Sequence, residues 1–178
     1  MAILPILEIP NPLLRRRAKK VRSLSNKTIS LAHDMVETMR EAGGVGLAAN
    51  QVGVLQRIIV IQLPEEEEAR IYLNPEILKT TGSRKIEEGC LSLPGYRGIV
   101  NRSIQIRFQA LDSNFKTIKF KADNLLSQAL EHEVDHLNGI LYTDHLVEHE
   151  SLYKIEEPKP TETLSADDLD TSSSFTIK

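Results

Sequence analysis

The chain has 178 residues, 40% hydrophobic residues and a formal net charge of −3, which suggests one globular domain with room for a core. With 22 basic and 25 acidic residues, no global field recruits nucleic acid or an anionic membrane, so we expect no direct nucleic-acid site and no membrane partner. Pro5 and Pro10 interrupt the short apolar N-terminus, and we expect neither a signal peptide nor a transmembrane helix. The single cysteine, Cys90, leaves no internal disulfide and fits a cytoplasmic, reducing compartment.

The first third of the chain predicts a basic turn, a helix and a glycine-rich loop. Residues 11–22 hold the basic cluster, which we interpret as a solvated turn because acidic residues elsewhere cancel its charge. Ser25 is typical of a helix N-cap, and apolar residues follow at helical spacing until Gly43. The loop GGVGLAANQVG at 43–53 has glycines and alanines that let backbone approach another group closely. The alternative is a tight loop packed on the core.

The middle of the chain predicts short strands. Asp112, Ser113 and Asn114 form a plausible hairpin turn between the last two of them. The segment EEGCLSLPGYRG, residues 87–98, is rich in turn formers yet contains the only cysteine. Short strands followed by one helix favour an α+β fold. The strand-like runs are residues 57–63, 70–75, 76–81, 104–111 and 115–121.

The stretch QALEHEVDHLNG carries the strongest chemical signal. His132 and His136 are four residues apart, so on a helix both imidazoles lie on one face and can bind one metal ion. Glu133 is then placed to act on a water at that ion. Asp123 can cap this helix, and Gly139 can end it. The alternative is a buried amphipathic helix that happens to carry two histidines.

Two imidazoles need a third ligand, and Cys90 is the strongest candidate in soft-ligand chemistry. Three protein ligands leave a position for water, which is the catalytic arrangement, whereas four would close a structural site. By itself, a lone cysteine is more often a small buried residue than a ligand. The candidates for a fourth ligand are His33, His145 and His149.

Beyond the motif helix, residues 139–146 predict a short strand or extended return, and residues 151–156 another strand. From Pro158 the composition becomes acidic and Ser/Thr-rich without apolar periodicity. We therefore predict one domain over 1–157 and a mobile tail over 158–178.

Three motifs, in this order and at these separations, resemble those of the peptide deformylases: GVGLAANQ (44–51), EGCLS (88–92) and HEVDH (132–136). The resemblance runs from about Ile9 to Leu146. It implies an α+β fold with antiparallel sheets around a central helix that carries HExxH. It also implies a hydrolase of N-terminal processing in protein biosynthesis, which removes the formyl group from formyl-methionyl nascent peptides in a bacterial-type cytoplasm and releases formate.

The resemblance implies roles for the motif residues. Cys90, His132 and His136 would bind one divalent metal ion, usually Fe(II) in this family, with zinc, nickel or cobalt possible in purified protein. Glu133 would be the general acid/base. Physical chemistry agrees, because a bound metal activates water and polarises a carbonyl, and a nearby carboxylate can move the proton.

The resemblance also implies an oxyanion site and a substrate pocket. Gln51 and the backbone N–H of Leu91 would stabilise the oxyanion, although the alternative for Gln51 is a loop amide that satisfies the backbone. Gly46 would contact the substrate backbone. The methionine pocket would involve Val45, Ile86, Leu125 and Ala129.

Outside these motifs, Asp135 is either paired with Arg102 behind the metal ligands or solvated on the helix. Some members of the family dock on the ribosome through a C-terminal helix, but residues 147–178 show no such apolar-basic helix, so we expect at most a transient ribosome contact.

Two other functions fit HExxH. A zinc peptidase would cut internal peptide bonds, but such enzymes usually complete the site with His or Glu, and EGCLS fits that poorly. A non-enzymatic metal- or peptide-binding module would have a closed four-ligand site and no turnover.

Overall fold

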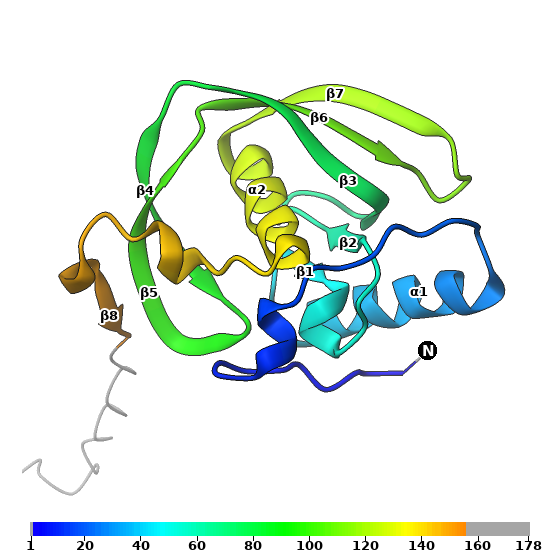
Figure 1. Ribbon diagram of the computed structural model, residues 1–178, viewed down its shortest axis with the longest axis horizontal. Coiled ribbons are helices and arrows are strands. Elements are labelled where there is room, and N and C mark those ends of the chain that lie inside the picture. Colours follow the sequence, from blue (N-terminus) through cyan, green and yellow to red (C-terminus); the bar gives the residue numbers. More distant parts are fainter. Residues whose placement is uncertain (1, 156–178) are drawn as a thin grey trace, which may run out of the picture.

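A single helix, α2 (Asn124–Asn138), occupies the centre of the molecule, with the strands of two antiparallel sheets around it (Figure 1). The structure is a computed structural model that describes residues 2–155, so the tail predicted over 158–178 and the ends of the domain predicted over 1–157 lie outside the described residues. The α+β fold expected from the sequence is confirmed, and α2 carries HExxH in its C-terminal half.

The two sheets differ in size, with five strands in one and three in the other. In spatial order, the larger sheet contains β1 (Gly46–Ala48), β2 (Ile58–Ile61), β3 (Arg70–Thr81), β6 (Gln105–Leu111) and β7 (Thr117–Asp123). The smaller sheet contains β4 (Arg84–Cys90), β5 (Leu93–Arg102) and β8 (Leu152–Lys154). The remaining elements are the helix α1 (Asn26–Glu41) and the 3-10 turns η1 (Pro12–Arg15), η2 (Ala49–Val52), η3 (Tyr142–His145) and η4 (His149–Ser151).

Strand β2 is buried on both faces, which explains its uninterrupted apolar sequence IIVI. Ile59 and Ile61 belong to the core cluster that also holds the apolar face of α2. Ile58 and Val60 belong to a second cluster with the apolar face of α1. Because successive side chains of a strand point to opposite faces, the two helices cover opposite faces of the sheet at β2.

The helix ends follow the predicted capping residues. Ser25 caps α1 by accepting a hydrogen bond from the N–H of Thr28 at 3.2 Å. Asp123 is the N-cap residue of α2 but makes no side-chain capping bond. Gly139 ends α2 in the left-handed region at φ 77°, which glycine adopts without a steric penalty.

Three stretches differ from the sequence-based expectation. The runs 70–75 and 76–81 form one strand, β3, whose register with β6 shifts between Leu73 and Glu76. The turn-rich segment 87–98 is mostly strand, because β4 and β5 pair along it as a hairpin. The short strand or extended return expected over 139–146 instead contains η3, because the carboxylate of Asp144 accepts a hydrogen bond from the N–H of Leu141 at 3.0 Å and closes a turn.

Candidate active site

Three possible metal ligands converge where the end of β4 meets α2. Sγ of Cys90 lies 3.2 Å from Nε2 of His136, and the Nε2 atoms of His132 and His136 lie 3.2 Å apart. The ligand atoms of all three residues lie within 4.8 Å of one another. Both imidazoles are buried and the thiol is half-buried. The fold therefore brings the three predicted ligands together.

This cluster fits one metal ion. Tetrahedral metal–nitrogen bonds of roughly 2.0–2.1 Å would place two nitrogens about 3.3 Å apart, close to the separation of the two imidazoles. Thiolate and imidazole donors suit Fe(II) and zinc. Within residues 2–155 this is the one group of three or more His, Cys, Asp or Glu side chains that could hold an ion. The histidines weighed as fourth ligands stay outside it: His33, His145 and His149.

Glu133 lies beside this cluster with one oxygen unengaged. Its side chain is buried, and Oε2 makes no hydrogen bond within the described residues. Burial raises the pKa of Glu133 to about 7, and the positive charge of a metal ion would lower it again. Gly46 of β1 packs directly against this carboxylate. Glu133 is thus a buried carboxylate next to three side chains that could hold a metal ion.

Gln51 in η2 faces the thiol with its amide orientation fixed. Its Oε1 accepts a hydrogen bond from the N–H of Ala48 at 2.8 Å. Its Nε2 therefore points the other way, 3.7 Å from Sγ of Cys90 and 3.2 Å from Oγ of Ser92. The side chain is 1% exposed, so the surrounding protein and not solvent determines where this N–H donor points.

Glu88 connects His132 to a buried arginine. Nδ1 of His132 donates to Oε1 of Glu88 at 2.5 Å, and Arg102 donates to both carboxylate oxygens at 2.7 and 3.0 Å. Burial alone would raise the pKa of Glu88, but the hydrogen bonds from His132 and Arg102 outweigh it and hold that pKa at about 2. The ionised carboxylate holds the N–H at Nδ1 and so orients the ring with Nε2 toward the ligand cluster.

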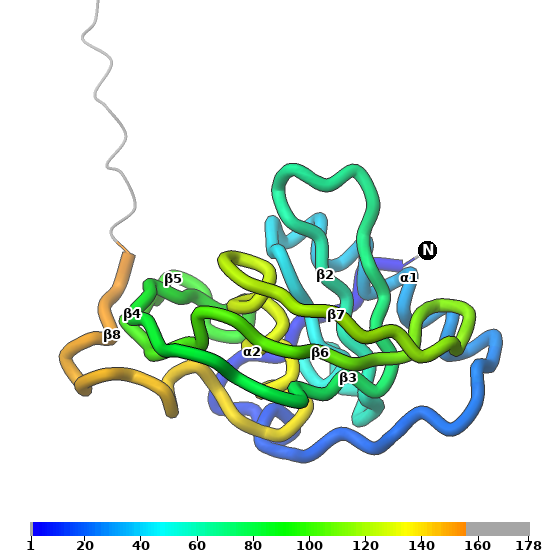
Figure 2. The backbone as a smooth tube through the Cα atoms, turned by 90° about the horizontal axis from the view of Figure 1, so that it is seen from above, coloured from blue at the N-terminus to red at the C-terminus, as the bar shows by residue number. Residues whose placement is uncertain are grey.

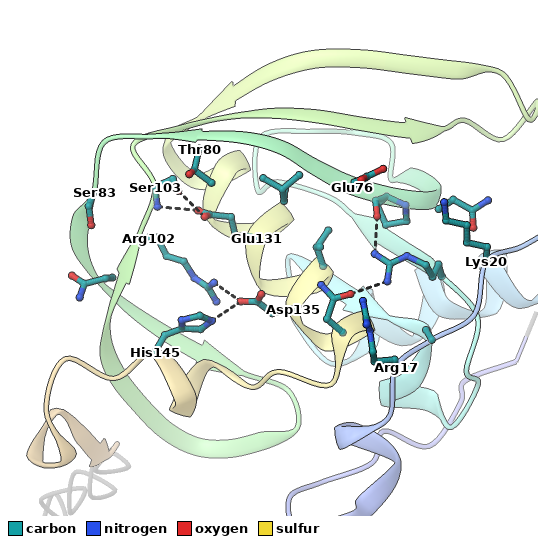
Figure 3. A pocket seen from close by; sticks show the side chains of 18 of the residues that line it. Arg17, Lys20, Glu76, Thr80, Ser83, Arg102, Ser103, Glu131, Asp135 and His145 are labelled. Carbon is teal, nitrogen blue, oxygen red and sulfur yellow. Dashed lines mark hydrogen bonds and ion pairs between the residues drawn. The ribbon is translucent and has the colours of Figure 1, made fainter.

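Arg102 extends this buried network to Asp135 and His145, which line a second cavity, separate from the one that opens onto the ligand cluster. Nη1 of Arg102 donates to Oδ2 of Asp135 at 2.5 Å, and Nε2 of His145 lies 2.9 Å from the same oxygen (Figure 3). The prediction that Asp135 pairs with Arg102 is confirmed. Since His145 is bonded there, it is directed away from the ligand cluster.

A cavity of about 460 Å³ opens onto the ligand cluster. Most predicted substrate-site residues line it, but Ile86 does not; it pairs with Val100 in the hairpin of β4 and β5. The predicted residues along the cavity are Val45, Gly46, Gln51, Leu91, Leu125 and Ala129.

Sequence reasoning missed several residues of this site. The role of Glu88 had a signal, because it lies two residues before Cys90 and strand alternation points both side chains to one face. Tyr96, Arg97 and Ile155 line the cavity rim without any local chemical pattern. They arrive there through strand pairing, since β8 pairs with β5 and the N–H of Ile155 donates to O of Gly95 at 2.8 Å.

One thiol and two imidazoles that could bind a metal, an open cavity and a buried carboxylate are together typical of a metal-dependent hydrolase. The polypeptide deformylase family model matches residues 3–151 of the chain, which therefore belongs to that family. Its members are enzymes that remove the N-formyl group from nascent peptides.

Individual relatives agree with this assignment. The peptide deformylase of Dehalococcoides mccartyi strain BAV1 is 46% identical over 155 residues, which cover 87% of this chain and 93% of the relative. The crystal structure of a peptide deformylase from Legionella pneumophila superposes with a TM-score of 0.79 at 41% identity, over 82% of this chain and 86% of that one. The Met-Ala-Ser-bound class I type b peptide deformylase of Acinetobacter baumannii gives 0.77 at 33% identity, over 82% and 99%.

Neither helix of residues 2–155 has the length and apolar character needed to cross a membrane.

Proposed function

We propose that this chain removes the formyl group from formyl-methionyl nascent peptides in the cavity beside α2, with Cys90, His132 and His136 holding one divalent metal ion. Fe(II) is the proposed native ion, and zinc, nickel or cobalt can replace it in purified protein. The observation that carries the proposal is the convergence of these three donors next to the buried, unpaired oxygen of Glu133.

When bound, the ion polarises the formyl carbonyl and lowers the pKa of water. Glu133 accepts a proton from the attacking water and returns it to the departing amine nitrogen. The C–N bond of the formamide breaks, the hydroxyl oxygen stays on the formyl carbon, and the products are formate and a free N-terminus. The buried position of Glu133 supports this role, because bulk solvent has little access to the carboxylate that carries the proton.

The oxygen that becomes negative in the reaction needs N–H donors. We assign them to Nε2 of Gln51 and the backbone N–H of Leu91. The hydrogen bond from the Ala48 N–H to Oε1 supports the role of Gln51, because it fixes the amide before substrate arrives. A donor held in place needs no reorganisation as charge develops.

The apolar part of the cavity suits the methionine side chain. Three lining residues form the proposed methionine pocket: Val45, Leu125 and Ala129. Gly46, which also lines the cavity, is proposed to contact the substrate backbone. Ile86, predicted for the same pocket, is not among the residues that line the cavity. That the related Acinetobacter enzyme binds Met-Ala-Ser supports a peptide in this cavity. A cytoplasmic location and a transient ribosome contact remain predictions.

Formate release from formyl-Met-Ala-Ser tests this function, with protein prepared without oxygen and its metal content measured. Glu133→Ala is the control, because it should keep the metal and lose turnover. Cleavage of internal bonds in an unblocked peptide would favour the zinc peptidase instead. Stable metal binding without any turnover would favour the binding module.

A further inference from the structure

A row of cations without ionic partners runs along one edge of the molecule. The segment 15–22, RRRAKKVR, has six basic residues in eight positions. Arg15 pairs with Asp144. The other five are exposed, and none forms an ion pair within residues 2–155. We call these five the basic edge: Arg16, Arg17, Lys19, Lys20 and Arg22.

The backbone under the basic edge is held firmly. The N–H of Ala18 donates to O of Leu137 at 2.8 Å, and the N–H of Lys19 donates to O of Leu55 at 2.9 Å. Val21 is bonded at both its N–H and its C=O to the side chain of Asn74, each at 2.8 Å. A solvated turn does not need such anchors. They hold a stretch of backbone about 20 Å long, at ~3.3 Å per extended residue, from which the five exposed side chains project.

Two residues of the basic edge also line the second cavity, which has a volume of about 670 Å³ (Figure 3). Arg17 and Lys20 line it together with Arg57. The guanidinium of Arg57 is fixed by hydrogen bonds to Oδ1 of Asn138 at 2.9 Å and to O of Pro75 at 2.8 Å.

Carboxylates do not balance the charge at this end of the cavity. Glu76 lines it beside Arg57, so three cations face one acid there. The other acids of the cavity are engaged elsewhere, because Glu131 bonds to Ser103 and Asp135 bonds to Arg102 (Figure 3). The repulsion between Arg17 and Arg57 makes an anion favourable between them.

The fold also separates the basic edge from the most acidic run of the chain. In Figure 2 the dark-blue segment that carries the basic edge runs along the bottom, whereas the turn with Glu65, Glu66, Glu67 and Glu68 forms the loop between β2 and β3 at the top. The net charge of −3 is a sum over the whole chain. It therefore does not describe the field that a ligand meets at this edge.

We propose that the basic edge, together with Arg57, binds the phosphodiester backbone of RNA. A row of unpaired Arg and Lys side chains on an anchored backbone suits a regular row of phosphates, since contacts of this kind depend on charge and spacing and not on sequence. The choice of RNA rests on the proposed function, because a nascent peptide is made on RNA. Such contacts would keep the enzyme near its substrate without touching the catalytic cavity.

Fluorescence anisotropy tests the proposal with intact, metal-loaded protein and a labelled oligouridylate of about 20 nucleotides. The variant is Arg17→Glu/Lys20→Glu. The matched control is Lys119→Glu/Lys121→Glu, which changes the net charge equally on exposed positions of β7. At about 50 mM salt we expect the first variant to weaken binding at least tenfold and to lower the salt dependence by about two phosphate contacts. The control should bind like wild type.

Several results would overturn the proposal. These are no RNA binding at low salt, equal weakening in both variants, or tighter binding of a matched oligodeoxythymidylate or of an acidic peptide. Release of the RNA by inorganic phosphate at constant ionic strength would assign the site to free phosphate and also overturn it. Melting temperature checks the fold of each variant. Formate release from a free formylated peptide should be equal in all three proteins, so a failure of RNA binding is distinguishable from a failure of the deformylase function.

Discussion

The side chain of Glu133 occupies the space that a Cβ atom on Gly46 would need. A methyl group built on Gly46 would lie 2.5 Å from Oε1 and 2.9 Å from Cγ of Glu133. A residue with any side chain at position 46 therefore cannot coexist with Glu133 in its present place. The glycine-rich loop was expected to let backbone approach another group closely, and the group it approaches is the proposed general base.

Gly46→Ala should lower kcat/KM for a formylated peptide by roughly a hundred-fold, because Glu133 must shift and small displacements of a catalytic group are costly. The metal content should stay normal, since no ligand is touched. The matched control is Gly44→Ala, whose new methyl would come closer than 3.0 Å only to Cδ1 of Leu91, at 2.7 Å, with Cγ of Leu91 and O of Gly46 at 3.4 Å. That side-chain end can rotate away, so the loss should be much smaller. Equal losses in the two variants would point to general damage to the loop.

Gln51→Leu should retain the metal and lose about a hundred- to a thousand-fold in kcat, because the leucine offers no donor to the oxyanion. It should also lower the free energy of unfolding by about 1–3 kcal/mol, since the buried N–H of Ala48 loses its acceptor. Steady-state kinetics, metal analysis and denaturant unfolding measure these effects. Near-normal kcat with bound metal would remove Gln51 from the oxyanion site.

Glu88→Gln should weaken metal binding by about ten- to a hundred-fold, because His132 loses the carboxylate that orients its ring. Competition with a chelator measures the affinity. Glu87→Gln is the control on the same strand, because Glu87 pairs with Arg97 and Tyr153 and does not touch a ligand. If both variants held the metal as tightly as wild type, the bond between His132 and Glu88 would have no orienting role.

Cys90 should be the oxidation-sensitive ligand when the protein carries Fe(II). A half-buried thiolate beside a redox-active ion is open to oxygen chemistry, and its loss removes one of three ligands. Protein loaded with zinc or nickel should therefore keep its activity in air for longer. Activity against time and mass spectrometry of the peptide containing Cys90 provide the comparison. The same rate of decay with every metal would argue against this mechanism.

The sequence predicted those parts of the molecule whose signal is local. The spacing of His132 and His136 needs only one helix, and the ends of α1 and α2 follow from Ser25 and Gly139. The hairpin of β4 and β5 was not predicted, because its glycines and proline look like turn formers until the partner strand is known. Gly98 illustrates this, since a Cβ there would lie 2.5 Å from Cδ2 of Leu146, far along the chain.

The parts of the site that sequence reasoning missed depend on long-range contacts. Glu88 acquires its role from Arg102, which is 14 residues away, and from His132, which is 44 residues away. Ile155 reaches the cavity rim only through the pairing of β8 with β5. Periodicity and motif spacing contain no information about such pairings.

The reacting end of the substrate should determine specificity, because side chains already pack closely around the space beside the ligand cluster. Gly46 already lies against Glu133, and the Cβ position of Gly44 is filled by Leu91. A formyl carbon carries only hydrogen, whereas an acetyl carbon carries a methyl group that needs additional room. That methyl would displace the carbonyl from the ion and from Gln51, and a small misplacement can cost about a hundred-fold.

The methionine pocket alone would discriminate weakly, by about 1–3 kcal/mol per methylene. We therefore expect kcat/KM for formyl-Met-Ala-Ser to exceed that for acetyl-Met-Ala-Ser by at least about a hundred-fold, with internal bonds left intact. Gly44→Ala provides a further test, because pushing Leu91 into the cavity should reduce activity on the acetylated peptide more than on the formylated one. Glu133→Ala should be inactive on both peptides. Comparable rates for the two blocked peptides would rule out steric exclusion at the formyl end, because the same cavity would then accept the larger acyl group.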